Sequence, residues 1–437
     1  MCKAFYYKNF DFNPVSGILK LSYQIDEQHT FCEEITFEDA PFHLDETKKQ
    51  ALNEIFFLTH IAFGISYYKT YCPEKIIIQS GNLTKQEADF FNTFYLNGLG
   101  EFAVRNNLNL QGKISFPFKE NFKRNTFHID LKERFLVPIG GGKDSCVSLS
   151  MLQQLNKETT PISVGNPRPI RECKEKSNQK SITCTRKIDQ KLIELNQTGT
   201  VYNGHVPITG MLAFILWASA LLYDYKFISM SSEASANEEN LMQGDLAVNH
   251  QYSKSFAFEQ DFHKLTNSIT PNFLYFSLLR CFSELKIAQL FAKTATPYFD
   301  VFTSCNKAFK LDTEKRLDRW CGCCDKCRFV FLVLAPFMEK ETLIKAVGQN
   351  PLDDLNNLTG YEELLGLSGH KPFECVGEIS ESRTAFHLLI NHPNYKNDKI
   401  ILALKDKVPL PEKDAFKLNP DHLIPTELYH EISKLNQ

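Results

Sequence analysis

The sequence carries little net charge of either sign and has no long hydrophobic run. Its 437 residues include 49 lysines and arginines against 52 aspartates and glutamates, which leaves a formal net charge of -3. Proteins that bind nucleic acid through its phosphates usually have a basic surface, so this balance argues against a nucleic-acid partner. The longest apolar stretch, residues 211–222, is too short to cross a bilayer and predicts a buried helix instead of a membrane contact.

The first residues also lack the apolar segment that follows the basic end of a secretory signal peptide. We therefore expect a cytoplasmic protein in which the 13 cysteines stay reduced and some of them bind metal. The chain has no internal repeat and no low-complexity tract. Hydrophobic residues make up 43% of the chain, and it contains 36 phenylalanines, so a large buried core is expected.

The chain divides into three parts that differ in pattern. Residues 1–130 mix strand-like and helical patterns without a recognisable motif, which predicts an N-terminal α+β domain. In residues 131–300, strands alternate with helices, the pattern of a parallel sheet with helices on both faces. Residues 301–437 form a cysteine-rich, mostly helical C-terminal region. In the middle part, we expect strands at residues 135–141, 160–165 and 225–232. We expect helices at residues 144–155, 186–196 and 208–224.

A glycine-rich turn follows the first of these strands, in the stretch FLVPIGGGKDS at residues 135–145. Glycines at a strand-to-helix turn let backbone N–H groups approach a ligand, and the helix that follows points its positive end at the same place. Phosphate suits both features. The spacing matches neither G-x-x-x-x-G-K-[ST] nor G-x-G-x-x-G, and an ordinary tight turn is the alternative. The candidate phosphate-binding residues are Gly140, Gly141, Gly142, Lys143, Asp144 and Ser145.

This turn resembles the PP-loop of ATP pyrophosphatases, whose pattern is S-G-G-x-D-S. Gly140 stands where that family has its first serine. Enzymes with a PP-loop cut ATP between the α and β phosphates and release pyrophosphate. The resemblance implies that residues 131–300 form an ATP-binding domain of the PP-loop type, like that of the adenine nucleotide α hydrolases.

A cluster of cysteines lies near residue 320, in the stretch WCGCCDKCRFVFL. Four thiols are enough for a tetrahedral zinc site, and a site filled by four thiolates would be structural because it leaves no open position. A similar arrangement occurs in PP-loop enzymes that make deazaguanine nitriles. The alternative is that reduced cysteines pack as small hydrophobic residues. The expected zinc ligands are Cys305, Cys321, Cys324 and Cys327, with Cys323 left over.

Four polar loops occupy the expected strand ends and the segments between the helices. In an open parallel sheet, ligands bind at the carboxyl ends of the strands, so these loops are expected to surround the glycine-rich turn. Each residue taken alone could be an ordinary solvated side chain, and only the set as a whole indicates a site. The polar residues of these loops are Arg168, His205, Thr209, Glu233, Asn237, Asn249, His250, Tyr252 and Lys254.

Taken in order, these stretches resemble the ATP-dependent epimerase family of peptidoglycan synthesis, which inverts the terminal glutamate of UDP-MurNAc-L-Ala-L-Glu. The resemblance covers residues 135–337, and residues 1–130 and the last hundred offer no motif to match. It implies a UDP-MurNAc-dipeptide substrate, ATP and Mg²⁺, with Glu233 and Asn237 added to the nucleotide-binding turn. The stretches that carry it are FLVPIGGGKDS, GNPRPI, NGHVPITG, SSEASANEEN, VNHQYSKSFAFE and WCGCCDKCRFVFLVLAPF.

The chemistry explains why such an isomerase would consume ATP. The Cα proton beside a free carboxylate is very weakly acidic, because its removal builds negative charge next to an existing one. Conversion of the carboxylate to an acyl-adenylate removes that charge, so an ordinary side chain can take the proton and return it on the other face. Two bases on opposite faces of Cα are the simplest arrangement. The candidates are His205, His250, Tyr252 and Lys254.

Two other functions are compatible with the sequence. A PP-loop enzyme that modifies a nucleobase or tRNA, as a thiolase, amidase or nitrile synthase, would fit the cysteine cluster, but the absence of a basic balance argues against tRNA. A non-catalytic nucleotide-binding or zinc-stabilised scaffold is the other alternative, and the intact Lys143, Asp144 and Ser145 argue against it. The sequence gives no indication of an oligomeric state.

Overall fold

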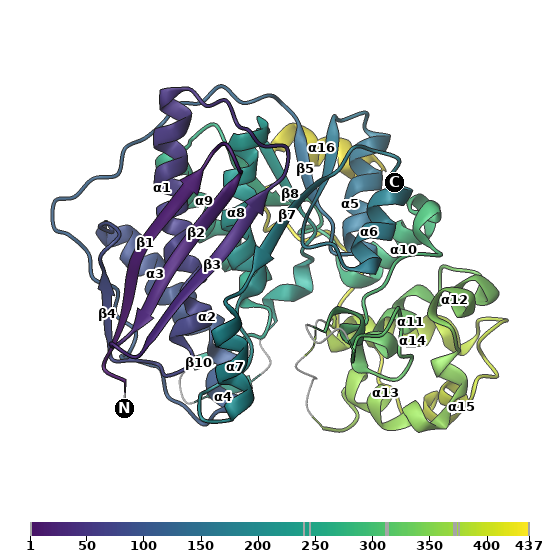
Figure 1. Ribbon diagram of the computed structural model, residues 1–437. Helices are drawn as coiled ribbons and strands as arrows, with labels where there is room; N and C mark the ends of the chain where they lie inside the picture. Colours follow the sequence, from purple (N-terminus) through teal and green to yellow (C-terminus); the bar gives the residue numbers. More distant parts are fainter. Residues whose placement is uncertain are drawn as a thin grey trace. The chain divides into compact units, whose positions relative to one another are not determined.

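The computed structural model describes residues 2–238, 241–243, 246–310, 314–369, 374 and 376–435 (Figure 1). The chain forms two compact units, and each unit is assembled from three separate segments. Unit 1 consists of residues 1–136, 182–228 and 241–275, and unit 2 consists of residues 137–181, 229–240 and 276–437. Segments that follow one another in the sequence therefore belong to different units.

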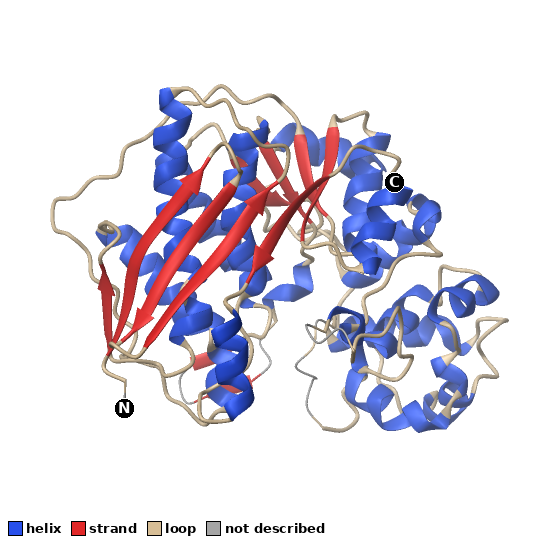
Figure 2. Cartoon of the chain, viewed as in Figure 1, coloured by secondary structure: helices blue, strands red, loops and turns tan. Residues whose placement is uncertain are grey.

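Nine strands form one sheet in the order β11-β8-β5-β6-β7-β3-β2-β1-β4. Figure 2 shows the strands as red arrows. The pairs β1–β2, β2–β3 and β3–β7 are antiparallel, whereas β1–β4 and β5–β8 are parallel. The strands are β1 Ala4–Asn13, β2 Ile18–Ile25, β3 His29–Phe37, β4 Lys75–Ile78, β5 Phe135–Pro138, β6 Thr159–Val164, β7 Ile182–Lys187, β8 Phe227–Met230 and β11 Leu274–Ser277. Two further strands, β9 Leu241–Gln243 and β10 Leu246–Val248, pair with each other.

Unit 1 has an aromatic and aliphatic core between its strands and helices. Every second residue of β2 from Leu19 to Ile25 is buried, as the period of two along a strand requires when one face meets the core. The apolar run at residues 211–222 lies in α8, which packs against α1. The helices are α1 Glu46–Phe63, α2 Ile65–Tyr68, α3 Lys85–Gly98, α4 Gly100–Arg105, α7 Gln190–Thr198, α8 Ile208–Tyr223, η2 Tyr252–Lys254 and α9 Phe256–Ile269.

Helices α10 and α11 are at the centre of the helix packing in unit 2. Helix α5 packs against α10, and the wholly apolar end of α11 packs against α10, α12, α13 and α14. The α-helices are α5 Lys143–Gln154, α6 Arg168–Lys176, α10 Glu284–Thr294, α11 Asp325–Leu334, α12 Lys340–Val347, α13 Leu358–Leu364, α14 Ile379–Ile390, α15 Lys399–Leu404 and α16 Thr426–Leu435. The 3₁₀ helices are η1 Ala234–Asn237, η3 Thr296–Tyr298, η4 Asn306–Phe309, η5 Pro351–Asp353 and η6 Leu355–Asn357.

The α/β class and the cysteine-rich C-terminal region are confirmed. Within residues 131–300, β5 and β8 pair in parallel, as expected, whereas the antiparallel pairs β1–β2, β2–β3 and β3–β7 of the nine-stranded sheet each involve a strand of the N-terminal part. The helix expected at 186–196 begins only at Gln190, because residues 182–187 form β7 and pair with β3. The expected buried helix at 211–222 is confirmed. In the described part of the chain, no helix has both the length and the hydropathy needed to cross a membrane.

Candidate functional site

The glycine-rich turn in unit 2 leaves no room for side chains at two of its positions. Gly141 has φ +81°, and a Cβ there would lie 3.0 Å from the Cβ of Pro169. A Cβ on Gly142 would lie 2.7 Å from the Oγ of Ser304. Gly140, by contrast, has open space where a Cβ would be, so the serine of the PP-loop pattern would fit there sterically. Glycine is therefore required at the centre of the turn, where φ is positive, whereas a side chain at Gly142 would need the Ser304 hydroxyl to move.

Hydrogen bonds hold this turn in shape at the start of α5. The Gly140 N–H donates to the Ser145 hydroxyl at 3.3 Å, and that hydroxyl donates to the Gly142 carbonyl at 3.2 Å. The Thr303 N–H donates to the Gly141 carbonyl at 2.7 Å. Helix α5 begins at Lys143 without a side-chain cap. Its first N–H groups and the positive end of its dipole therefore offer a site suited to an anion such as phosphate.

Lys143 is buried inside unit 2 between two carboxylates. Its side chain is only 1% exposed, and its ammonium group forms ion pairs with Asp144 and Glu284. Burial by itself would lower the pKa of Lys143, but the charges of Asp144 and Glu284 outweigh burial and raise it. Glu284, the first residue of α10, was not predicted from the sequence. It lies 141 positions from Lys143, in a segment whose pattern is that of an ordinary amphipathic helix.

Three carboxylates of unit 2 converge beside this lysine. Oxygen atoms of Asp144, Glu233 and Glu284 all lie within 4.8 Å of one another. Burial raises the pKa of Glu284, and the charge of Lys143 opposes that rise. Carboxylate oxygens are the ligands that Mg²⁺ takes in proteins, so the chemistry of this donor set fits the ion. The structure thus brings Glu233 together with the turn, as the sequence predicted for a nucleotide site.

Asn237 lies four residues after Glu233, in the same short segment. It ends η1 and lines a cavity of about 560 Å³ within unit 2, together with Glu381 and Ser283. Burial and the charge of Glu284 raise the pKa of Glu381 to about 8, and Glu381 accepts a hydrogen bond from the Glu284 N–H at 2.7 Å. Asn237 does not belong to the carboxylate group. The final residues of the stretch SSEASANEEN, 239 and 240, lie outside the described residues.

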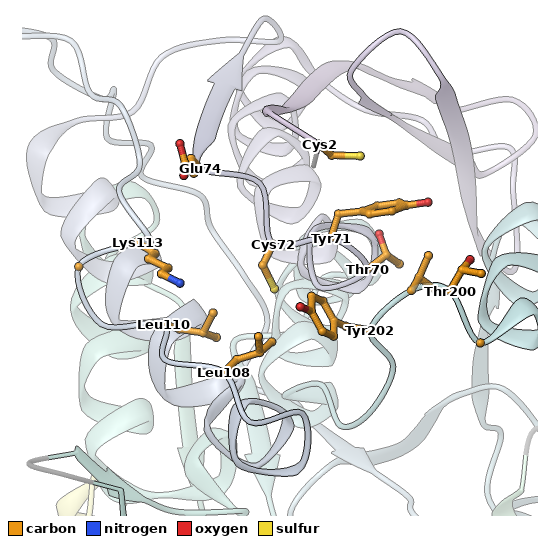
Figure 3. A pocket seen from close by; sticks show the side chains of 13 residues that line it. Cys2, Thr70, Tyr71, Cys72, Glu74, Leu108, Leu110, Lys113, Thr200 and Tyr202 are labelled. Carbon is orange, nitrogen blue, oxygen red and sulfur yellow. The ribbon is translucent and has the colours of Figure 1, made fainter.

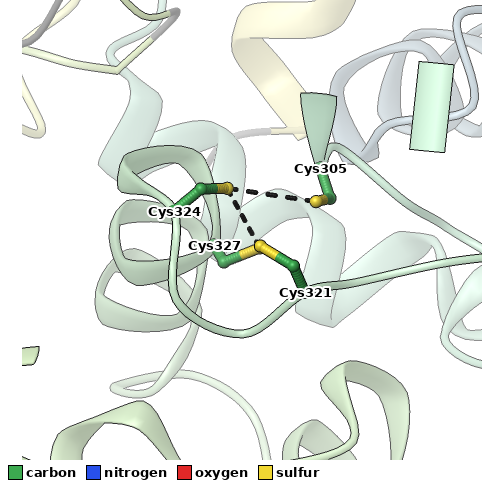
Figure 4. Close-up of side chains that lie close together, drawn as sticks. All are labelled: Cys305, Cys321, Cys324 and Cys327. Carbon is green, nitrogen blue, oxygen red and sulfur yellow. Dashed lines mark hydrogen bonds between the residues drawn. The ribbon is translucent and has the colours of Figure 1, made fainter. Parts of the chain in front are cut away.

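The four cysteines that were expected to bind zinc lie together in unit 2, and their side chains point toward one another (Figure 4). The Sγ–Sγ distances are 3.9 Å for Cys305–Cys324, 3.7 Å for Cys321–Cys327 and 3.4 Å for Cys324–Cys327. Four sulfurs bound at about 2.3 Å to a tetrahedral zinc lie about 3.8 Å apart, so the set fits this ion. Cys323 is exposed, although its Sγ lies 3.8 Å from that of Cys321.

A second cluster, in unit 1, contains two of the predicted bases. His205 and His250 lie with their ring centroids 4.6 Å apart, and both face the carboxylate of Glu101. Burial and the neighbouring His250 lower the pKa of His205 to about 4. Glu101, in α4, was not predicted from the sequence because nothing in its segment resembles a catalytic motif. We refer to Glu101, His205 and His250 as the histidine cluster.

The other polar loop residues have different surroundings. Tyr252 is buried against Phe258, and burial raises its pKa. Lys254 is close enough for its charge to act on His205. Arg168 is exposed and forms ion pairs with Glu172 and Asp318. The structure therefore places two of the predicted bases, His205 and His250, in a common cluster with a carboxylate.

Unit 1 also has a pocket of about 710 Å³ (Figure 3). Its lining mixes apolar, hydroxyl and charged side chains, and none of the residues predicted to act on substrate or nucleotide belongs to it. The residues that line it are Cys2, Thr70, Tyr71, Cys72, Glu74, Leu108, Leu110, Gly112, Lys113, Gly199, Thr200, Val201 and Tyr202.

Comparison with known proteins extends the likeness to nearly the whole chain. The MurL N-terminal domain matches residues 1–278, and the MurL C-terminal domain matches residues 301–418. The protein of Xanthomonas oryzae pv. oryzae named UDP-N-acetyl-alpha-D-muramoyl-L-alanyl-L-glutamate epimerase is 38% identical, over 95% of this chain and 94% of its own length. A protein of Salinispora tropica with the same name is 37% identical, over 93% of this chain and 89% of its own length. This chain therefore belongs to the MurL family.

Proposed function

We propose that this protein converts the terminal L-glutamate of UDP-MurNAc-L-Ala-L-Glu to D-glutamate in peptidoglycan synthesis and consumes ATP in the reaction. The likeness to curated epimerases over at least 93% of the chain is the observation that carries the proposal. It extends through both units and includes the segments that hold the glycine-rich turn, the four cysteines and the histidine cluster. The finer steps rest on the geometry of these three elements.

The glycine-rich turn is the proposed ATP site, and residues 131–300 are the proposed PP-loop domain. The backbone N–H groups of the turn and the start of α5 would hold phosphate oxygens. The ammonium group of Lys143 would supply a positive charge beside them. Asp144, Glu233 and Glu284 are the groups that would hold Mg²⁺. When bound, the ion neutralises charge on the phosphates. Cleavage of ATP between the α and β phosphates leaves the adenylate on the glutamate carboxylate and releases pyrophosphate.

The adenylate makes the glutamate Cα–H acidic enough for a side-chain base. The electron pair left on Cα spreads into the activated carbonyl, which no longer bears a carboxylate charge. A base takes the proton from one face of Cα, and a second group then delivers a proton to the opposite face. Hydrolysis of the adenylate finally gives the D-glutamate product and AMP. The clustering in unit 1 favours His205 and His250 as the candidates for the base that takes the Cα proton.

The four cysteines are proposed to hold a structural zinc ion. Cys305 precedes η4, and Cys327 lies in the first turn of α11. An ion bound by all four thiolates would therefore join the loop before η4, the loop before α11 and the first turn of α11. Four thiolates leave no open position for substrate, so the ion would stabilise unit 2 and take no part in the reaction.

Two ATP analogues test where the nucleotide is cut. With ATP and Mg²⁺, we expect one AMP and one pyrophosphate for each D-glutamate residue formed, measured by chiral analysis of the hydrolysed product. The α,β-methylene analogue will not support the reaction because its bridging carbon cannot be displaced. The β,γ-methylene analogue will support it, because the bond that breaks is intact. Epimerisation at an unchanged rate with the α,β-methylene analogue, or without nucleotide, would refute the ATP-dependent mechanism.

A further inference from the structure

The carboxylate of Glu101 is shared by the two histidines of unit 1. His250 Nδ1 and Glu101 Oε2 form a short hydrogen bond, and His205 Nδ1 lies 3.7 Å from the same oxygen. The other oxygen, Oε1, accepts a hydrogen bond from Arg105 Nε at 2.5 Å. Glu101 is 6% exposed, so its charge is only weakly screened by water. Both oxygens of this buried carboxylate therefore have partners, and the two histidines among these partners are predicted bases.

Helix α4 brings Glu101 close to both histidine-bearing segments. A Cβ on Gly100 would lie 3.2 Å from a methyl carbon of Val248, so the start of α4 packs tightly on the residues just before His250. At the other end of the helix, the Asn106 amide donates to the Asn203 carbonyl at 3.1 Å. This bond fixes the loop two residues before His205. The carboxylate is thus placed by packing on one side and by a hydrogen bond on the other.

We propose that Glu101 is the positioning residue of the epimerase: it accepts the Nδ1–H of His250 and leaves Nε2 of that ring as the base for the substrate Cα. The proposal rests on the proposed function and adds to it which histidine acts and in which tautomer. A carboxylate that holds one ring nitrogen fixes both the tautomer and the orientation of the imidazole. His250 and Glu101 then act as a pair, and His205 is the neutral neighbour.

Charge balance supports this assignment. The proton that leaves Cα moves to Nε2 of His250 and makes the ring positive, while the electron pair on Cα passes into the activated carbonyl. The hydrogen bond and charge of His250 lower the pKa of Glu101 to about 2 in spite of its burial, so the carboxylate is negative when the ring becomes positive. Two adjacent imidazoles do not both take a proton readily, and the low pKa of His205 keeps that ring neutral.

The test is Glu101→Gln, which keeps the shape of the side chain and removes its charge. We expect Cα–deuterium exchange to fall by about 10²–10⁴-fold, the range for loss of a general base or of its orienting carboxylate, with AMP formation close to wild type. Nitrogen-15 NMR, assigned with His250→Gln, should show Nδ1 protonated in the wild type and the proton moved to Nε2 in Glu101→Gln. A merely structural role for Glu101 would not move this proton.

The matched control is Glu87→Gln. Glu87 is also buried in a helix of unit 1 and paired with an arginine, Arg124. A glutamine at this position can still accept the capping hydrogen bond from the Thr84 N–H. If Glu101→Gln exchanges the Cα proton at the wild-type rate, or if the tautomer of His250 does not change in this variant, the inference is overturned. A metal ion bound by wild type and lost in Glu101→Gln would also overturn it. Absence of exchange in the wild type would instead refute the proposed function.

Discussion

Replacing Lys143 with methionine will reduce AMP formation by about 10²–10³-fold, the loss expected when one charge-stabilising group is removed from a site that handles phosphate. The same change will also destabilise unit 2. Glu284 is 1% exposed and forms a close ion pair with Lys143, so methionine leaves its charge buried without that partner. Breaking a buried ion pair from one side costs about 3–5 kcal/mol. Urea denaturation and chromatography of the nucleotides measure the two effects.

A double variant separates stability from function. Lys143→Met with Glu284→Gln removes both charges, so we expect most of the stability to return while AMP formation stays low, since the variant lacks both the ammonium group and one of the proposed Mg²⁺ ligands. Lys174→Met is the matched control, because Lys174 is also buried in unit 2, on α6, where it donates to Ser163 at 3.0 Å. That variant should keep AMP formation. Full activity in Lys143→Met, or its return in the double variant, would mean that the turn does not bind the phosphates of ATP.

Replacing Cys327 with serine will remove the zinc ion and unfold part of unit 2. Cys327 is buried, and its Sγ lies within 3.7 Å of those of both Cys321 and Cys324. Structural zinc contributes about 10–16 kcal/mol to folding in zinc-finger peptides. Even about 5 kcal/mol would lower the Tm by about 10–20 °C, since each kcal/mol shifts it by about 2–4 °C in domains of this size. Metal analysis and thermal melting measure both effects.

Cys323→Ser is the control for the cysteine cluster, because this residue is exposed and lies outside the group of four. It should bind one zinc per chain and melt as the wild type does. If purified wild type is folded without zinc, the cysteines act as packing residues only. If Cys323→Ser loses the metal as Cys327→Ser does, the ligand set is wrong.

Features determined by neighbouring residues were predictable from the sequence. The turn at 140–145 and the helix at 211–222 depend on local composition, glycines after an apolar strand in one case and an unbroken apolar run in the other. The spacing of Cys321, Cys324 and Cys327 likewise belongs to one short stretch. In these segments the local pattern and the final packing agree.

Features that depend on distant residues were missed. Residues 182–187 form a strand because β3 pairs with them, and nothing within the segment reveals that partner. Glu284 and Glu101 became candidates only because folding brings them into contact with Lys143 and His250. In the sequence, these pairs are 141 and 149 positions apart. A single acidic residue at the start of a helix is usually a favourable charge beside the helix dipole, so its sequence position does not distinguish it from many others.

The most direct test of the proposed reaction is to run it in deuterium oxide. The protein is incubated with UDP-MurNAc-L-Ala-L-Glu, ATP and Mg²⁺, and the product is analysed by mass spectrometry and proton NMR. We predict D-glutamate with deuterium at Cα, formed together with AMP and pyrophosphate, because the group that delivers a proton to the opposite face has exchanged with solvent deuterium. Cleavage of ATP without any exchange at Cα would contradict the account, since the adenylate would then serve transfer to another acceptor.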